Sequence, residues 1–229
     1  MKTKILIMNG RGYERAIEGL GDFTHSIQEF METPDLFKLV MFTGGEDVGP
    51  ELYGHTSPNH LCGYRKQRDA EEKEVFDLAL SFSIPMVGIC RGSQFLNVMS
   101  GGTMIHHLDG HGGNHMMRTN DNSLIEVTST HHQMSKPSAD GYVLAWSEDK
   151  QSHSYYGDKD ALEDYQGPEV EAHYYPGTKV FAVQYHPEYM QKHSEGYIWF
   201  RDGVLDLMTL NKAAFKAKYV LEEGNKVSA

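Results

Sequence analysis

The central segment of this chain reads Pro85-Met86-Val87-Gly88-Ile89-Cys90-Arg91-Gly92-Ser93-Gln94-Phe95-Leu96-Asn97-Val98-Met99. Residues 86–89 form an apolar run typical of a buried strand, and from Phe95 onward the apolar residues recur at helical spacing. Cys90 therefore falls at a strand-to-helix turn between Gly88 and Gly92, whose small size permits a sharp turn with an accessible side chain. The helix dipole favours a thiolate there, so the pattern predicts a nucleophile. A buried structural cysteine is the alternative.

Composition narrows the class of protein. The 229 residues are 39% hydrophobic and 23% charged, which predicts a packed core, and we expect one domain over residues 1–229. A net charge of −11 argues against nucleic acid or an anionic membrane surface as a partner. Two cysteines, Cys62 and Cys90, make no disulfide framework, so a cytoplasmic setting is the simplest expectation.

Strand and helix patterns alternate along the first half of the chain. Strands are predicted at residues 4–8, 37–42 and 86–89, with an amphipathic helix at 68–82 whose acidic residues 71–74 we expect to be solvated. This order predicts an α/β fold with a mostly parallel central sheet flanked by helices.

The second half has a different character. Residues 103–122 are rich in Gly, His and Asn and are expected to be mostly loop. Further strands, antiparallel in this interpretation, are predicted in the C-terminal half, followed by two helices. The expected strands are 124–128, 142–146, 170–174 and 179–184, and the expected helices are 194–210 and 212–221.

A thiol nucleophile needs a base, and the segment Val183-Gln184-Tyr185-His186-Pro187-Glu188 offers one. Alternation of apolar residues predicts a strand that Pro187 ends. Residues two apart in an extended chain point to the same side, so Glu188 is placed to orient the ring of His186. A histidine in such a position is more often structural when it stands alone, and its coincidence with the Cys90 turn is what favours catalysis.

Two glycines, Gly44 and Gly45, follow the predicted strand 37–42. Glycines at the carboxyl end of a parallel strand let backbone N–H groups approach a ligand, and ligands of open α/β sheets bind at this edge. We therefore predict an oxyanion hole from the N–H groups of Gly45 and Arg91, with Gly44 lining the substrate site. An ordinary tight turn is the alternative.

Four blocks of this sequence, taken together, resemble the class I glutamine amidotransferase superfamily. They are residues 44–54, residues 88–103, the triplet His131-His132-Gln133 and residues 185–188. The first and third blocks look most like the gamma-glutamyl-gamma-aminobutyrate hydrolase family of cysteine peptidases. The resemblance implies a flavodoxin-like fold of that superfamily and a triad of Cys90, His186 and Glu188. It also implies substrate contacts by Gln94 and by Thr130, His131 and His132.

This resemblance predicts a cysteine hydrolase that cleaves a γ-glutamyl amide through a glutamyl thioester, without a cofactor. The same residues suit a glutaminase subunit that supplies ammonia to a separate synthetase partner. A non-catalytic binding module on the same fold is a third hypothesis, which a complete triad disfavours.

The histidine-rich residues 106–115 require a separate interpretation. His106, His107, His111 and His115, with Asp109, have a spacing that suits a zinc site. Gly110, Gly112 and Gly113 break any helix that would fix such a geometry. We therefore predict no metal and expect a loop at the mouth of the active site.

Overall fold

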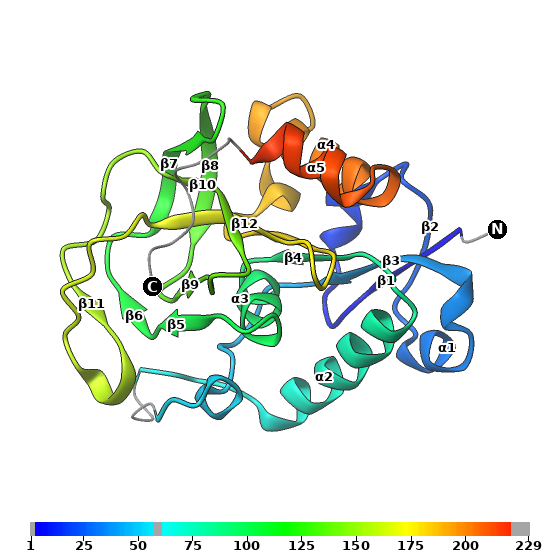
Figure 1. Ribbon diagram of the computed structural model, residues 1–229, viewed down its shortest axis with the longest axis horizontal. Helices are drawn as coiled ribbons and strands as arrows, with labels where there is room; N and C mark the ends of the chain where they lie inside the picture. The colour runs from blue at the N-terminus through cyan, green and yellow to red at the C-terminus, as the bar shows by residue number, and fades with distance from the viewer. Residues whose placement is uncertain (1–2, 57–60, 221–229) are drawn as a thin grey trace.

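The computed structural model describes residues 3–56 and 61–220, and its centre is a mixed sheet in the order β2-β1-β3-β4-β13-β12-β10-β7-β8 (Figure 1). The strands are β1 (Lys4–Ile7), β2 (Asp22–Thr24), β3 (Phe37–Phe42), β4 (Met86–Ile89), β7 (Gly112–Thr119), β8 (Leu124–Thr130), β10 (Tyr142–Ser147), β12 (Val170–Tyr175) and β13 (Val180–Val183). Neighbours from β2 to β13 are parallel, and neighbours from β13 to β8 are antiparallel. The predicted α/β class, with a parallel core and antiparallel strands in the second half, is confirmed.

Shorter elements complete the chain. Two small antiparallel pairs join β5 (Thr103–Ile105) to β9 (Met134–Lys136) and β6 (His107–Leu108) to β11 (Tyr155–Tyr156). The α-helices are α1 (Ile27–Glu32), α2 (Lys66–Ser81), α3 (Arg91–Met99), α4 (Glu195–Thr209) and α5 (Lys212–Tyr219). The 3₁₀ helices are η1 (Tyr13–Ile17), η2 (Pro34–Leu36), η3 (Pro50–Tyr53), η4 (Asp158–Asp160) and η5 (Pro187–Tyr189). The predicted helix 212–221 matches α5, which ends at Tyr219, and Leu221 lies outside the described residues.

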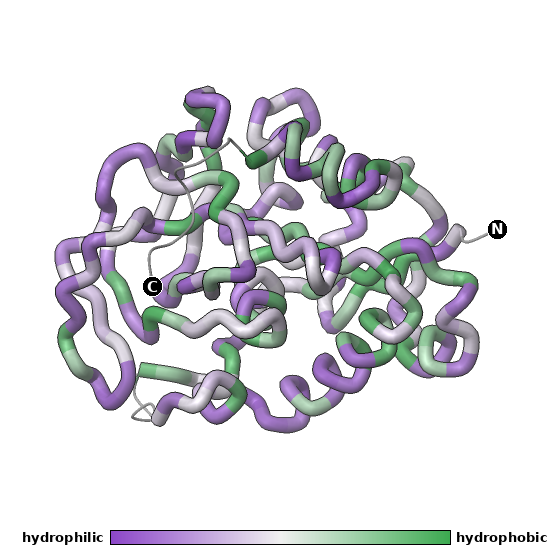
Figure 2. The backbone as a smooth tube through the Cα atoms, in the orientation of Figure 1, coloured by the Kyte–Doolittle hydropathy of each residue, from purple (hydrophilic) through white to green (hydrophobic). Residues whose placement is uncertain are grey.

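Helices cover both faces of the parallel strands, which explains why those strands are apolar on both sides. Val40 and Phe42 of β3 pack in one core with side chains from α1, α2 and α3. Leu39 and Met41, which point the other way, pack with side chains from α4 and α5. Hydrophobic residues accordingly follow the central strands, whereas hydrophilic residues lie along the outer turns (Figure 2). None of the helices that the structure describes is long and apolar enough to cross a membrane.

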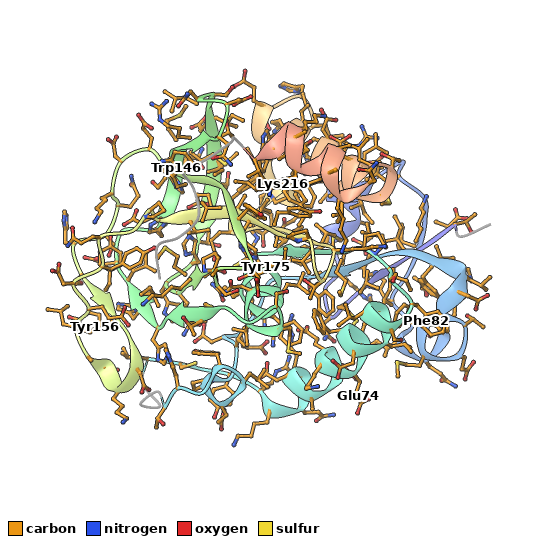
Figure 3. The ribbon with its side chains drawn as sticks, in the orientation of Figure 1. Glu74, Phe82, Trp146, Tyr156, Tyr175 and Lys216 are labelled. Atoms are coloured by element: carbon orange, nitrogen blue, oxygen red, sulfur yellow. The ribbon has the colours of Figure 1, made fainter. Side chains whose placement is uncertain are left out.

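The expectation that the acidic residues 71–74 are all solvated is wrong for Glu72. Its side chain is fully buried on α2, where one carboxylate oxygen accepts from Arg68 Nε at 2.9 Å and the other pairs with Arg91. Glu74, labelled in Figure 3, is exposed on the same helix as expected. Hydrophobic periodicity treats every carboxylate as a surface group, so it misses one that two buried guanidinium groups neutralise.

The expectation that residues 103–122 are mostly loop is also wrong. Gly112–Thr119 form β7, which pairs with β8 along its whole length and ends against β10. The sequence of β7, Gly-Gly-Asn-His-Met-Met-Arg-Thr, is exposed at its first three positions and has no apolar alternation. Main-chain pairing with two neighbours fixes this strand, and that pairing leaves no hydrophobic signal in the sequence.

Candidate active site

Cys90 occupies the turn between β4 and α3, with φ 53° and ψ −114°. This backbone conformation is rare for a residue with a side chain and costs on the order of 1–3 kcal/mol. A Cβ at Gly88 would lie 2.6 Å from the backbone of Gly92, and a Cβ at Gly92 would meet the carbonyl oxygen of Phe42. The two glycines are therefore required for α3 to start so close to β3 and β4. The predicted sharp turn at Cys90 is present.

His186 follows β13, the strand that pairs in parallel with β4 next to Cys90. Its backbone N–H donates to the carbonyl of Thr128 at 3.0 Å, and its Nδ1 donates to Glu188 Oε1 at 2.6 Å. Both side chains are buried. A Cβ placed on Gly44 would lie 3.2 Å from the His186 ring and 3.6 Å from Cys90 Cβ, so these three residues meet at one point.

The charge state of His186 follows from its neighbours. Burial alone lowers the pKa of the imidazole, but hydrogen bonding and charge interactions with Cys90 and Glu188 outweigh burial and raise the pKa to about 10. These two neighbours therefore favour the imidazolium form of the ring. An imidazolium next to a thiol stabilises the thiolate, which is the reactive form of cysteine.

The loop of Gly44 and Gly45 is held from behind by Arg68. Its Nη2 donates to the carbonyl oxygens of Thr43 at 3.1 Å and Gly44 at 3.0 Å. The Gly44 carbonyl and the Gly45 N–H belong to one trans peptide, so they point in opposite directions and the N–H faces away from Arg68. Gly45 has φ 143°, and a Cβ there would meet the Arg68 guanidinium, which explains the glycine.

The side chain of Arg91 is turned away from the thiol and into the same buried ion network. It pairs with Asp69 and Glu72, two residues of α2. Asp69 in turn accepts from the backbone N–H of Gly49 at 3.0 Å. Arg91 is therefore available to the site only through its backbone N–H, as the predicted oxyanion hole requires. Glu72 joins Arg68 to Arg91, so a single carboxylate connects both predicted halves of that hole.

Of the predicted substrate contacts, Thr130, His131 and His132 lie on the opposite wall at the end of β8, whereas Gln94 lies on α3. Gln94 is buried one turn into α3, and its amide nitrogen donates to the carbonyl of Gln133 at 3.0 Å and to Gln184 Oε1 at 3.3 Å. His132 is half-exposed and its Nε2 lies 3.1 Å from Asp47 Oδ1. Thr130 is exposed. The ring of His131 is buried and directed away from solvent, so only its backbone is placed for a role toward substrate.

The histidines of residues 106–115 do not form one cluster. His106 Nε2 lies 3.0 Å from His55 Nδ1, and His107 Nδ1 lies 3.3 Å from His132 Nδ1. Asp109 instead accepts hydrogen bonds from a neighbouring loop, including the N–H of His153 at 2.9 Å. The spacing in the sequence suggested common ligands, but the strands send these side chains in different directions.

Two tyrosines lie beside Cys90 and His186 that the sequence did not identify as site residues. Tyr189 stacks on the ring of His186 with a centroid distance of 4.9 Å. The hydroxyl of Tyr13, in η1, lies against Gly44, and burial raises the pKa of this phenol above its ordinary value. The position of Tyr189, three residues after His186, was a usable signal. Tyr13 lies 77 residues before Cys90, and nothing in the sequence joins them.

Parts of this chain are similar in sequence to known proteins. Residues 22–139, just over half of the chain, match the model of the Peptidase C26 family. The glutamine amidotransferase-like protein YvdE of Lactococcus lactis is 31% identical over 178 residues, which cover 73% of this chain and 71% of that protein. The gamma-glutamyl-CDP-amidate hydrolase of Campylobacter jejuni is 40% identical over 68 residues, or 30% of each chain.

The fold also has counterparts among solved structures. A glutamine amidotransferase of Thermotoga maritima superposes with a TM-score of 0.52 and 15% sequence identity, covering 96% of this chain and 91% of that one. Among the curated relatives, the aligned parts cover 29%, 51% and 45% of the length of three further proteins. This chain thus spans about half or less of those relatives.

Proposed function

This chain belongs to the peptidase C26 family, within the class I glutamine amidotransferase superfamily, and on that premise we propose that it hydrolyses a γ-glutamyl amide through Cys90, His186 and Glu188. The observation that carries the proposal is the strained Cys90 turn beside a buried His186 that Glu188 holds at 2.6 Å. The name of the Campylobacter jejuni relative supports γ-glutamyl compounds as the substrate class.

The reaction proceeds in two half-reactions. The Cys90 thiolate attacks the γ-carbonyl carbon, and the backbone N–H groups of Gly45 and Arg91 stabilise the oxyanion that forms. The imidazolium of His186 then protonates the departing nitrogen, so the amine leaves and a glutamyl thioester remains on Cys90. Water attacks this thioester while His186 accepts its proton, which releases glutamate and regenerates the thiolate. Glu188 holds the ring and compensates its charge throughout.

Recognition of the glutamyl group is assigned to the opposite wall. The α-amine and α-carboxylate of the substrate need polar partners in a partly desolvated cleft. We assign this role to Thr130, the backbone of His131 and the half-exposed ring of His132 at the end of β8, and to Gly44 beside Cys90. Gln94 acts on the same wall through its hydrogen bond to Gln133, which fixes the segment that follows β8.

A substrate panel tests this function. The purified chain is incubated with γ-glutamyl amines, γ-glutamyl peptides and glutamine, and glutamate release is measured for wild type, Cys90→Ala and Cys62→Ala. We expect turnover of γ-glutamyl compounds by wild type and Cys62→Ala, and none by Cys90→Ala.

Other outcomes identify the competing functions. Turnover restricted to glutamine, and then only with a synthetase present, would assign the chain as a glutaminase subunit. No glutamate release from any γ-glutamyl compound, with or without a synthetase, would contradict an enzymatic role and favour a binding module.

A further inference from the structure

A second cluster of chemically competent side chains lies outside the Cys90 site, where β7, β8 and β12 come together. It consists of His111, His115, His131, Glu169 and Glu171. His111 immediately precedes β7, His115 lies within it, and His131 follows β8. The side chains of His111, His131 and Glu171 are at most 2% exposed. The proposed hydrolysis uses none of these side chains.

The sheet leaves room for this cluster because β10 is short. The last residue of β10, Ser147, pairs with Met117, so the first half of β7 has no strand between it and the start of β12. The carboxylate of Glu171, on β12, extends into that space, where its Oε1 lies 3.0 Å from Nε2 of His115. Side chains rather than main-chain hydrogen bonds therefore connect β12 to the β7–β8 hairpin at this point.

The outer hydrogen bonds fix the tautomers of two rings. Nε2 of His111 lies 3.0 Å from the Glu169 carboxylate, and Nδ1 of His131 lies 2.8 Å from the carbonyl oxygen of Gln133. Both partners are acceptors only, so these two nitrogens carry the protons. In the neutral rings, Nδ1 of His111 and Nε2 of His131 must then present lone pairs to Glu171.

Hydrogen-bond acceptor atoms therefore face one another at the centre of the cluster. Nδ1 of His111, Nε2 of His131 and Oε2 of Glu171 are buried, and none has a hydrogen-bond partner within residues 3–56 and 61–220. Buried polar atoms normally find partners, so three unsatisfied acceptors around one point call for a cation. The cation is either a metal ion or the protons of two additional imidazolium groups.

The distances favour a metal. Nδ1 of His111 and Nε2 of His131 lie 3.6 and 3.8 Å from Glu171 Oε1, and Nε2 of His115 lies 3.0 Å from the same oxygen. Four ligands at zinc-bond lengths of about 2.0–2.2 Å define a tetrahedron with edges of about 3.3–3.6 Å. One ligand atom from each of His111, His131 and Glu171 lies within 4.8 Å of the other two, so these three side chains can meet at one ion and leave a fourth position open.

We propose that His111, His131 and Glu171 bind a divalent transition-metal ion of the zinc class, while His115 holds the Glu171 carboxylate from beside the site. Imidazole nitrogens with one carboxylate select such an ion over Ca²⁺ or Mg²⁺, which prefer ligand sets made of oxygen. Glu169 supports the site from outside by orienting the ring of His111, as carboxylates commonly do behind metal-bound histidines. The ion is structural, because it is surrounded by buried protein ligands and joins β12 to the β7–β8 hairpin.

The site is coupled to the proposed substrate wall. The carbonyl oxygen of Gln133 accepts from both His131 Nδ1 and Gln94 Nε2. A metal on the other nitrogen of His131 fixes that ring, and the ring in turn fixes the carbonyl that Gln94 uses. Metal loss is therefore expected to loosen the segment that follows β8 without changing Cys90 itself.

Cobalt binding to the full-length chain provides the test. The protein is treated with chelator, dialysed and titrated with Co²⁺, whose four-coordinate complexes absorb intensely in the visible range, and Zn²⁺ is then added. We expect one equivalent of Co²⁺ to produce these bands, one equivalent of Zn²⁺ to abolish them, and Zn²⁺ to raise the melting temperature. A wild-type protein that shows no such bands would overturn the proposal, and NMR showing His111 and His131 doubly protonated at pH 8 would assign the compensating charge to protons.

Matched variants locate the ion. His111→Asn removes a ligand and is expected to abolish the Co²⁺ bands, whereas Glu169→Gln is expected to weaken Zn²⁺ binding by about 10- to 100-fold. His193→Asn changes an exposed histidine elsewhere and should bind as wild type does. Because His111→Asn could fail by misfolding, Glu169→Gln provides the graded measurement on a protein that keeps all three ligands. Binding unchanged in both variants would place the metal on surface histidines and refute the site.

Discussion

Glu72→Gln tests how far the buried ion network stabilises the protein. The wild-type carboxylate is fully buried and pairs with the guanidinium groups of both Arg68 and Arg91. A glutamine has nearly the same shape but leaves these cations short of one negative charge and directs an NH₂ group at one of them. Breaking a buried ion pair from one side costs about 3–5 kcal/mol. For a chain of this length such a loss lowers the melting temperature by about 6–20 °C.

Urea denaturation of Glu72→Gln, followed by fluorescence, measures this loss as a lower midpoint at unchanged m-value. Glu74→Gln is the matched control, because it makes the same substitution two residues away on the exposed side of α2. We expect the control to stay within about 0.5 kcal/mol of wild type. If Glu72→Gln is also within about 1 kcal/mol of wild type, the network contributes little and our interpretation of α2 is wrong.

Three further changes address the active site. Cys90→Ala should abolish glutamate release with the fold intact, whereas Cys62→Ala should retain it; an essential Cys62 would refute the assignment. In the wild type His186 loses its proton as the pH rises through its pKa of about 10, and Glu188→Gln should lower this pKa. An NMR titration of the His186 ring with an unchanged midpoint would contradict the role of Glu188. Gly92→Ala should reduce the yield of folded protein, since its Cβ meets the carbonyl of β3, and wild-type stability in that variant would argue against a tight turn.

The fold was most predictable where the signal is local. Fifteen consecutive residues contain the apolar run 86–89, Cys90 and the helical spacing that follows it. The structure has the corresponding strand, turn and helix in that order. The pairing of His186 with Glu188 was predictable for the same reason, because residues two apart in an extended chain point to the same side. Their approach to Cys90 depended on the order of strands, which the sequence alone does not determine.

The rest could not be predicted because it depends on pairing between distant segments. Glu72 looks like a surface residue until Arg91, nineteen positions later, is placed beneath it. His131 follows β8 and Glu171 lies on β12, and the early end of β10 lets them approach each other. Tyr13 is brought to Gly44 by η1, and no local pattern in the sequence connects these two residues. Charge complementarity and the tertiary fold determine where these side chains lie, and hydrophobic periodicity contains no information about either.

Covalent trapping of the nucleophile tests the proposed chemistry most directly. The purified chain is treated with the glutamine analogue 6-diazo-5-oxo-L-norleucine, and the adduct is located by mass spectrometry of the intact protein and its peptides. We predict a single addition on Cys90, in step with the loss of glutamate release, and the same addition in Cys62→Ala but not in Cys90→Ala. An adduct on Cys62, or full loss of activity with Cys90 unmodified, would contradict the assignment of Cys90 as the nucleophile.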